Sequence, residues 1–206
     1  MKTYAFIPIK AFSERVENKN FRMYNGKKLY EHILLATKKA DCFDKICVDT
    51  DSSEICEFAA SHGMNTILRK AFLAQNDANG NDLLNYHASI YNCDYYFQLF
   101  ATAPNLKAES IKICVEKLRE SSKHDSIFTV ERDKGWYWYN GLPVNYRPSV
   151  LPRSQDTEGI LKETTGLYGI KKEALLKYKC RIGATPYMHE LSGEETKDID
   201  WPEDLK

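Results

Sequence analysis

The sequence lacks the common signatures of metal binding and of glycine-rich nucleotide binding. Its six cysteines form no C-x-x-C pair, and its five histidines show no ligand spacing against them, which argues against a Cys/His zinc site. Neither G-x-x-x-x-G-K-[ST] nor G-x-G-x-x-G is present, so a P-loop NTPase and a dinucleotide-binding Rossmann enzyme are disfavoured. No apolar stretch approaches the roughly 20 residues of a membrane span, and the N-terminus lacks a signal-peptide pattern. We expect a cytoplasmic protein without a membrane partner.

An excess of charge of either sign is also missing. The chain carries 29 basic and 29 acidic residues, so it lacks the basic footprint of a nucleic-acid-binding protein, and we expect no nucleic-acid partner. Aromatic residues are abundant, with 13 Tyr, 9 Phe and 3 Trp among 206 residues, which is enough to build a sizeable core. The length suits one α/β domain, and we expect residues 1–206 to form a single domain.

Strand and helix patterns alternate through the first half of the chain. Short apolar runs predict buried strands at residues 4–9, 45–48, 65–68 and 95–100, with helical spacing between them. Asp51 and Glu54 resemble a capping box for the helix that ends at Gly63. Strands separated by helices predict βαβ units and a mainly parallel sheet, whose sites lie beyond the carboxyl ends of the strands.

The pattern changes after about residue 131. Residues 135–141 read GWYWYNG, and the Asn140-Gly141 pair predicts the turn of a β-hairpin. We therefore expect a hairpin insertion over residues 131–160. Its rings could belong to a core, but so many on one arm suit an interface.

Two clusters of charged residues are candidates for chemistry. The loop after the first strand carries Lys10, Arg15 and Lys19, which could wrap a triphosphate or simply face solvent. Asp198 and Asp200 flank one residue of an extended segment, so both carboxylates could reach one Mg²⁺ ion. Alternatively, Asp200 caps a short helix that begins at Pro202.

Other polar residues have simpler interpretations. Asp49 and Asp51 form a second D-x-D at a strand end, but Asp51 is better explained as a helix cap than as a metal ligand. His87 and His189 have no partner at a telling spacing, so ordinary packing or surface roles are expected for them.

A family resemblance connects these features. The runs IPIKAFSERVENKNFRMYNGKKL and CFDKICVDTDSSEICEFAASHGM resemble the opening motifs of the acylneuraminate cytidylyltransferases, the CMP-sialic acid and CMP-KDO synthetases. Further matching segments follow in the family's order at residues 68–82, 102–104, 152–155 and 198–200. The resemblance covers essentially the whole chain.

The resemblance implies a three-layer α/β/α nucleotidyltransferase (Rossmann-like) fold, with a mainly parallel sheet and a protruding β-hairpin that serves as a dimerisation arm. It implies a CTP-dependent cytidylyltransferase that uses Mg²⁺ and transfers CMP from CTP to an acidic, sialic-acid-like sugar or a related small metabolite. Pyrophosphate would be released, and the product would serve surface-glycan or capsule polysaccharide biosynthesis. The expected partners are therefore CTP, a small acidic acceptor and a second copy of the chain.

The resemblance also assigns roles to residues. Nucleotide binding is expected of Lys10, Ala11, Arg15, Lys19, Asn20 and Asp77. Asp198 and Asp200 would hold the metal, and the catalytic residues would be Asp200, Lys19 and Arg15, with Asp200 or a metal-bound water taking the acceptor's proton. Acceptor binding is expected of Gln98, Phe100, Arg153, Gln155 and Glu163.

Departures from the family pattern concentrate in the acceptor half. Lys10 stands for an arginine and Arg15 for a lysine, which preserves the positive charge. Phe100 replaces a glutamine expected to meet the acceptor, and Gln98, on the same strand face, could substitute for it. Arg153 could bind an acceptor carboxylate or phosphate, or form a structural ion pair. The acceptor therefore need not be a sialic acid.

Three alternatives stay open at the level of sequence. One is a nucleotidyltransferase that uses another NTP or a phosphorylated or non-sugar acceptor. Another is a glycosyltransferase of related fold, with Asp49 and Asp51 as its metal motif. The last is a catalytically inactive binding module, which would be indifferent to Asp200→Asn.

Overall fold

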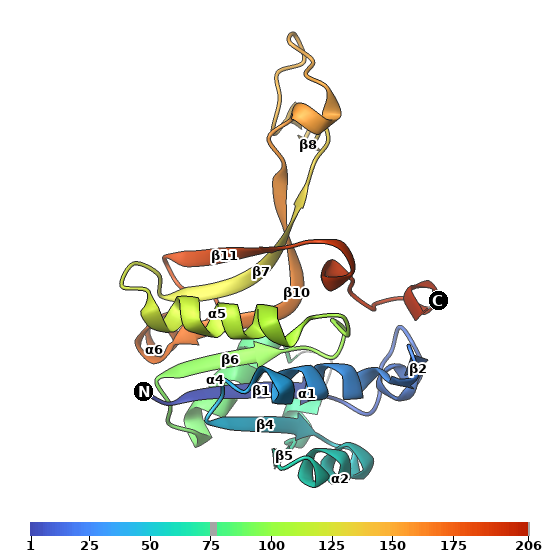
Figure 1. The fold of residues 1–206 in the computed structure, drawn as a ribbon, viewed down its shortest axis with the longest axis vertical. Helices are drawn as coiled ribbons and strands as arrows, with labels where there is room; N and C mark the ends of the chain where they lie inside the picture. The colour runs from blue at the N-terminus through green and yellow to red at the C-terminus, as the bar shows by residue number, and fades with distance from the viewer. Residues whose placement is uncertain (75–77, 206) are drawn as a thin grey trace.

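A seven-stranded sheet forms the centre of the molecule, in the order β11-β7-β10-β6-β1-β4-β5 (Figure 1). The computed structural model describes residues 1–74 and 78–205. Neighbouring strands run parallel except at β10, which is antiparallel to both β6 and β7. The strands are β1 (Thr3–Ile9), β4 (Lys45–Thr50), β5 (Asn65–Leu68), β6 (Tyr95–Leu99), β7 (Ser126–Asp133), β10 (Ile160–Lys171) and β11 (Pro186–Leu191).

Helices cover both faces of this sheet. Strand β1 is apolar along its length because both of its faces are buried: Ala5 and Ile7 pack into one core cluster, and Phe6 packs into another. The first cluster includes residues of α1 (Leu29–Ala40), α2 (Ser53–Ser61) and α5 (Ala108–Glu120). The second includes residues of α4 (Gly80–Ile90) and α6 (Lys172–Tyr178). The predicted three-layer α/β architecture with a mainly parallel sheet is confirmed.

The start of α2 differs from the prediction. Its N-cap is Ser52, whose hydroxyl accepts a hydrogen bond from the Ile55 amide. The Asp51 carboxylate instead accepts from the Ala11 amide, 2.7 Å away in the loop after β1. The assignment of Asp51 as the helix cap was therefore wrong, because a tertiary contact takes its carboxylate while the next residue caps the helix.

Two Asn-Gly turns form hairpins. Asn25-Gly26 joins β2 (Met23–Tyr24) to β3 (Lys27–Lys28), and Asn140-Gly141 joins β8 (Trp138–Tyr139) to β9 (Leu142–Pro143). All four turn residues have positive φ, as a two-residue hairpin turn of this class requires. The second hairpin lies in an arm that extends β7 and β10 far beyond the body (Figure 1). The predicted hairpin is thus present.

The remaining elements are short. They are η1 (Lys19–Phe21), α3 (Ala71–Ala74), η2 (Ser154–Asp156), η3 (Gly193–Thr196) and η4 (Pro202–Leu205). In the described ranges, no helix combines the length and the apolar content that crossing a membrane requires.

Candidate functional site

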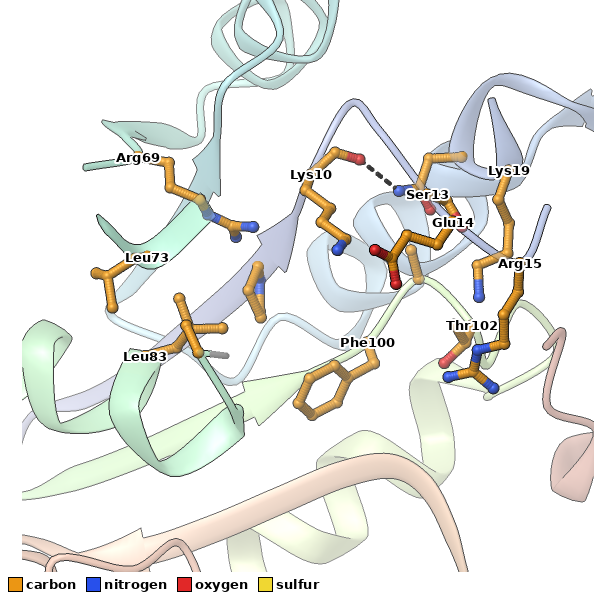
Figure 2. A pocket seen from close by; sticks show the side chains of 14 residues that line it. Lys10, Ser13, Glu14, Arg15, Lys19, Arg69, Leu73, Leu83, Phe100 and Thr102 are labelled. Carbon is orange, nitrogen blue, oxygen red and sulfur yellow. Dashed lines mark hydrogen bonds between the residues drawn. The ribbon is translucent and has the colours of Figure 1, made fainter. Parts of the chain in front are cut away.

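A cavity of about 340 Å³ lies where three parallel strands end. The loop after β1 contributes Lys10, Arg15 and Lys19 to its wall, and Arg69 follows β5 on the opposite side (Figure 2). Phe100, directly after β6, forms part of the wall between these two sides. Among the described residues, four cationic side chains and one carboxylate, that of Glu14, line the cavity, which favours an anionic ligand.

The loop that carries these cations is held by hydrogen bonds at both ends. The Ala11 amide donates to Asp51, and the Asn20 side-chain amide donates to the Lys10 carbonyl at 2.8 Å (Figure 2). The ammonium group of Lys19 donates to the Ile199 carbonyl at 2.8 Å. Ala11 and Asn20, predicted as nucleotide-binding residues, therefore fasten the loop through these bonds, and Asn20 also lines the cavity.

Asp200 faces the cationic loop. Its carboxylate lies 2.9 Å from the Arg15 guanidinium and 3.3 Å from the ammonium of Lys19, which is itself almost fully buried. The alternative role of Asp200 as a helix cap is not seen, because its carboxylate pairs with Arg15 and Lys19, while the Asp204 carboxylate accepts from the backbone amides of Asp200 and Trp201. The Asp200 carboxylate is therefore directed at the loop, and the structure brings together the three residues predicted to be catalytic.

Asp198 occupies a more enclosed position. One of its carboxylate oxygens accepts from the Thr165 hydroxyl at 2.8 Å, and the other is buried without a hydrogen-bond partner in the described part of the chain. Burial raises the pKa of Asp198, the Asp200 charge adds to this rise, and the hydroxyls of Thr165 and Thr102 partly offset it. A buried, unpartnered carboxylate oxygen beside a second carboxylate suits a divalent cation.

The metal site would be incomplete on protein ligands alone. Among residues 1–74 and 78–205, no group of three or more His, Cys, Asp or Glu side chains could hold a metal ion. Mg²⁺ commonly takes one or two carboxylates and completes its shell with waters and substrate phosphates. The Asp198–Asp200 pair beside a cationic cavity fits that requirement.

Thr165 owes its position to a distortion of β10. The register between β10 and β7 shifts between Glu163 and Tyr168, and Thr165 has a φ of 56°. A β-branched residue in the left-handed region is strained. The distortion nevertheless brings the Thr165 hydroxyl to Asp198, so the local strain is offset by a contact within the site.

A buried network beneath the cavity was not anticipated from sequence. The Asp49 carboxylate accepts from Arg69 Nε at 3.0 Å and lies 2.8 Å from His87 Nε2, and all three side chains are buried. Burial would raise the pKa of Asp49, but the His87 hydrogen bond and the Arg69 charge together lower it. The His87 ring also stacks on Phe6 at 4.8 Å.

This network gives Asp49 and His87 structural roles beside the cavity. Asp49 fixes a guanidinium in the cavity wall, and His87 supports Asp49 as well as packing in the core. The Asp49–Asp51 metal motif of the glycosyltransferase alternative is not available in this arrangement, because both carboxylates are already engaged.

Some predicted acceptor residues lie beside the cavity. Gln98 is buried in β6 and donates to the Gly80 carbonyl at 3.0 Å, and Phe100 lines the cavity wall. Glu163 accepts from the Tyr168 hydroxyl at 2.6 Å, and the Tyr168 ring packs edge-on against Phe100. Arg181, which the sequence gave no reason to single out, lies 3.6 Å above the Tyr168 ring.

Other predicted site residues are not brought to the cavity of this chain. Arg153 lies in the arm, where its guanidinium pairs with Asp156 at 2.5 Å, as the structural alternative proposed. Gln155 is also in the arm, and its carbonyl accepts from Lys134 at 3.1 Å. Asp77 lies outside the described residues.

Comparison with known proteins adds independent findings. The sequence model of the cytidylyltransferase family matches residues 4–195 of this chain. N-acylneuraminate cytidylyltransferase A of Danio rerio is 27% identical over 96% of this chain and 49% of its own length. CMP-N,N'-diacetyllegionaminic acid synthase of Legionella pneumophila is 29% identical over 78% of this chain and 66% of its own length. The chain spans about half the length of curated relatives such as the first.

A solved structure shares the fold. CMP:2-keto-3-deoxy-manno-octonic acid synthetase complexed with CTP has a TM-score of 0.73 to this chain at 16% identity. The match covers 100% of this chain and 95% of that one.

Proposed function

The chain belongs to the cytidylyltransferase family, and on that premise we propose that it transfers CMP from Mg·CTP to a hydroxyl of an acidic sugar or a related acidic metabolite, releasing pyrophosphate. The observation that carries the proposal is the cationic loop at the end of β1, whose Arg15 and Lys19 line the cavity and pair with the Asp200 carboxylate. Cations suit a triphosphate, and the paired carboxylates suit the ion that accompanies it. The wider purpose in this proposal is the activation of a sugar for surface-glycan assembly.

Positioning and charge neutralisation do most of the work in such a reaction. The triphosphate is bound by Lys10, Arg15 and Lys19. Arg15 and Lys19, which already pair with Asp200, thereby gain a second anionic partner. Asp198 and Asp200 are the residues that would hold Mg²⁺, which supplies additional positive charge to the phosphates.

The transfer exchanges one bond to phosphorus for another. The acceptor oxygen attacks the α-phosphorus, the bond from that phosphorus to the bridging oxygen of pyrophosphate breaks, and its electron pair leaves with pyrophosphate. The acceptor's hydroxyl proton passes to Asp200, which is exposed enough to be reached by a ligand. Lys19 is fixed by the Ile199 carbonyl, so its charge is already in place when the leaving group develops negative charge.

The test is pyrophosphate release from CTP and Mg²⁺ with a panel of acidic sugars. Asp200→Asn should lower the rate by at least about 100-fold while the protein stays folded, because it removes a metal-binding and proton-accepting carboxylate. Glu203→Gln removes an exposed carboxylate three residues away and serves as the control. An Asp200→Asn protein as active as the control would contradict the proposal, and a binding module without activity would release no pyrophosphate at all.

The proposal includes a homodimer formed through the arm. Several large apolar side chains of the arm are exposed, among them Trp138, Tyr139, Leu142 and Val150. An exposed apolar cluster on a projecting segment suits a protein interface. Sedimentation analysis should show that the wild-type chain is a dimer. The double variant Tyr139→Ser/Leu142→Ser should weaken this dimer, whereas Leu176→Ser, at an exposed position of α6, should leave it intact. A monomeric wild-type chain would contradict this part.

The proposed compartment is the cytoplasm, where CTP is available. All six cysteines are free thiols in the structure, as expected in a reducing compartment.

A further inference from the structure

We propose that Arg181 binds the carboxylate of the acceptor, at the end of the cavity formed by Phe100. The inference rests on the proposed function, because it assigns a residue to the acceptor's charge. Arg181 lies in the loop after α6, and its guanidinium carbon is 3.6 Å from the Tyr168 ring centroid and 5.6 Å from that of Phe100. Phe100 lines the cavity, so the width of one aromatic ring separates Arg181 from it.

No carboxylate of residues 1–74 and 78–205 pairs with the guanidinium of Arg181. Within the part of the chain that the structure describes, Arg181 forms no ion pair, whereas the cations Arg15, Lys19 and Arg69 all have carboxylate partners within 4 Å. Arg181 is half-buried, so part of its surface is withdrawn from water. An arginine held over the face of a ring, with no carboxylate partner among the described residues, is suited to bidentate binding of a carboxylate.

The loop that carries Arg181 is fixed on both sides. The Arg181 amide donates to the Asn81 side chain at 2.9 Å, and the Asn85 side chain donates to the Lys179 carbonyl at 2.8 Å, which ties the loop to α4. The amides of Ala184 and Thr185 both donate to the Asp125 carboxylate. A ligand would therefore meet a guanidinium whose backbone is already ordered, which reduces the entropic cost of binding.

Tyr168 supports the guanidinium. Its hydroxyl donates to Glu163 at 2.6 Å, and its ring contacts both Arg181 and the stacked ring of Phe128. A cation over the face of a fixed aromatic ring is attracted to it. Glu163, predicted to contact the acceptor, therefore serves in this proposal to orient Tyr168 and through it Arg181.

Gly80 and Gln98 mark the space beside the guanidinium. A Cβ atom on Gly80 would lie 2.5 Å from Arg181 Nη1 and 3.3 Å from Gln98 Oε1, so only glycine leaves the guanidinium in its place. Gln98 is buried, and its Oε1 atom has no hydrogen-bond partner among the residues that the structure describes. The Arg181 guanidinium and the Gln98 amide oxygen thus both lie close to Gly80, and a sugar acid presents a carboxylate for the guanidinium.

The experiment compares a sugar acid with its uncharged methyl ester. N-acetylneuraminate and N,N'-diacetyllegionaminate are assayed for pyrophosphate release with the full chain at saturating Mg·CTP, followed by the methyl ester of the acid that is used. Arg181→Gln should raise the KM for the acid by at least about 10-fold and abolish the preference for acid over ester, because one charged hydrogen-bonding partner is removed. The KM for CTP should not change.

Three further variants make the result specific. Arg181→Lys keeps the charge but loses the fork and should show an intermediate KM. Gly80→Ala displaces the guanidinium without removing it and should raise the acid's KM. Arg119→Gln, at an exposed position of α5, should behave as wild type.

The outcomes separate this proposal from the proposed function. An Arg181→Gln protein with a wild-type KM for the acid, or with equal losses for acid and ester, would overturn the carboxylate site. Wild-type protein that binds CTP but uses neither acid would overturn it too, while leaving the nucleotide site standing. Failure to bind CTP would instead refute the proposed function itself.

Discussion

Removing the charge of Asp49 should strongly destabilise the protein, although the residue is neither catalytic nor exposed. Its carboxylate is fully buried and lies 3.0 Å from Arg69 Nε and 2.8 Å from His87 Nε2. Asp49→Asn keeps the shape but leaves the Arg69 guanidinium buried without a counter-charge. Breaking a buried ion pair from one side costs about 3 to 5 kcal/mol. For a domain of this size, a loss of 3 kcal/mol lowers the melting temperature by roughly 6 to 12 °C.

A double-mutant cycle shows whether the charge pair is responsible. Urea unfolding is measured for wild type, Asp49→Asn, Arg69→Gln and the double variant, with Glu57→Gln on the exposed side of α2 as the control. Because the double variant buries no unpaired charge, its loss should be smaller than the sum of the single losses by at least about 1 kcal/mol. Additive losses, or an Asp49→Asn variant within about 0.5 kcal/mol of wild type, would refute the reasoning.

Three other predictions follow from local structure. The pKa of Asp49 is lower in the folded protein than its unfolded value of about 3.9. The ionised carboxylate therefore stabilises the fold above that pH, and this stabilisation is lost as the pH falls through the folded pKa. Below about pH 4, the free energy of unfolding should fall more for wild type than for Asp49→Asn. Thr165→Asn should raise the free energy of unfolding in urea by up to about 1 kcal/mol, because asparagine tolerates the left-handed region and its amide can still donate to Asp198. A loss of stability would contradict the strain assigned to Thr165. Gly169→Ala should cost about 1 to 3 kcal/mol, because the added methyl would collide with the Phe97 ring, and a neutral result would show that β6 and β10 can separate.

The sequence predicted the fold where the pattern was local. The continuous apolar run of β1 follows from burial on both faces, and the Asn140-Gly141 turn follows from positive φ at both residues. The sequence did not single out the N-cap residue of α2, because Asp51 and Ser52 are both of types that favour this position. The choice between them was made by the Ala11 amide, which lies 40 positions earlier in the chain.

The site was predictable only in part, because several of its contacts join residues that are far apart in the sequence. Lys19 and Asp200 were singled out by motifs, and the structure places them 3.3 Å apart. The Asp49–Arg69–His87 network joins side chains from three separate elements, and no spacing in the sequence signals it. Arg181 is an isolated arginine in a loop, and no spacing in the sequence signals its contact with Tyr168 or the hydrogen bond of its amide to Asn81.

The most direct test of the nucleotide site is the thermal stability of the full chain with CTP, UTP, ATP or GTP, each with and without Mg²⁺. A ligand that binds only the folded state at 100 times its Kd stabilises by about 2.7 kcal/mol. For a domain of this length, that corresponds to a rise of roughly 5 to 11 °C. We predict a rise that is largest with CTP and depends on Mg²⁺. Equal shifts with all four nucleotides, or no shift at millimolar concentrations, would contradict the assignment of this cavity to Mg·CTP.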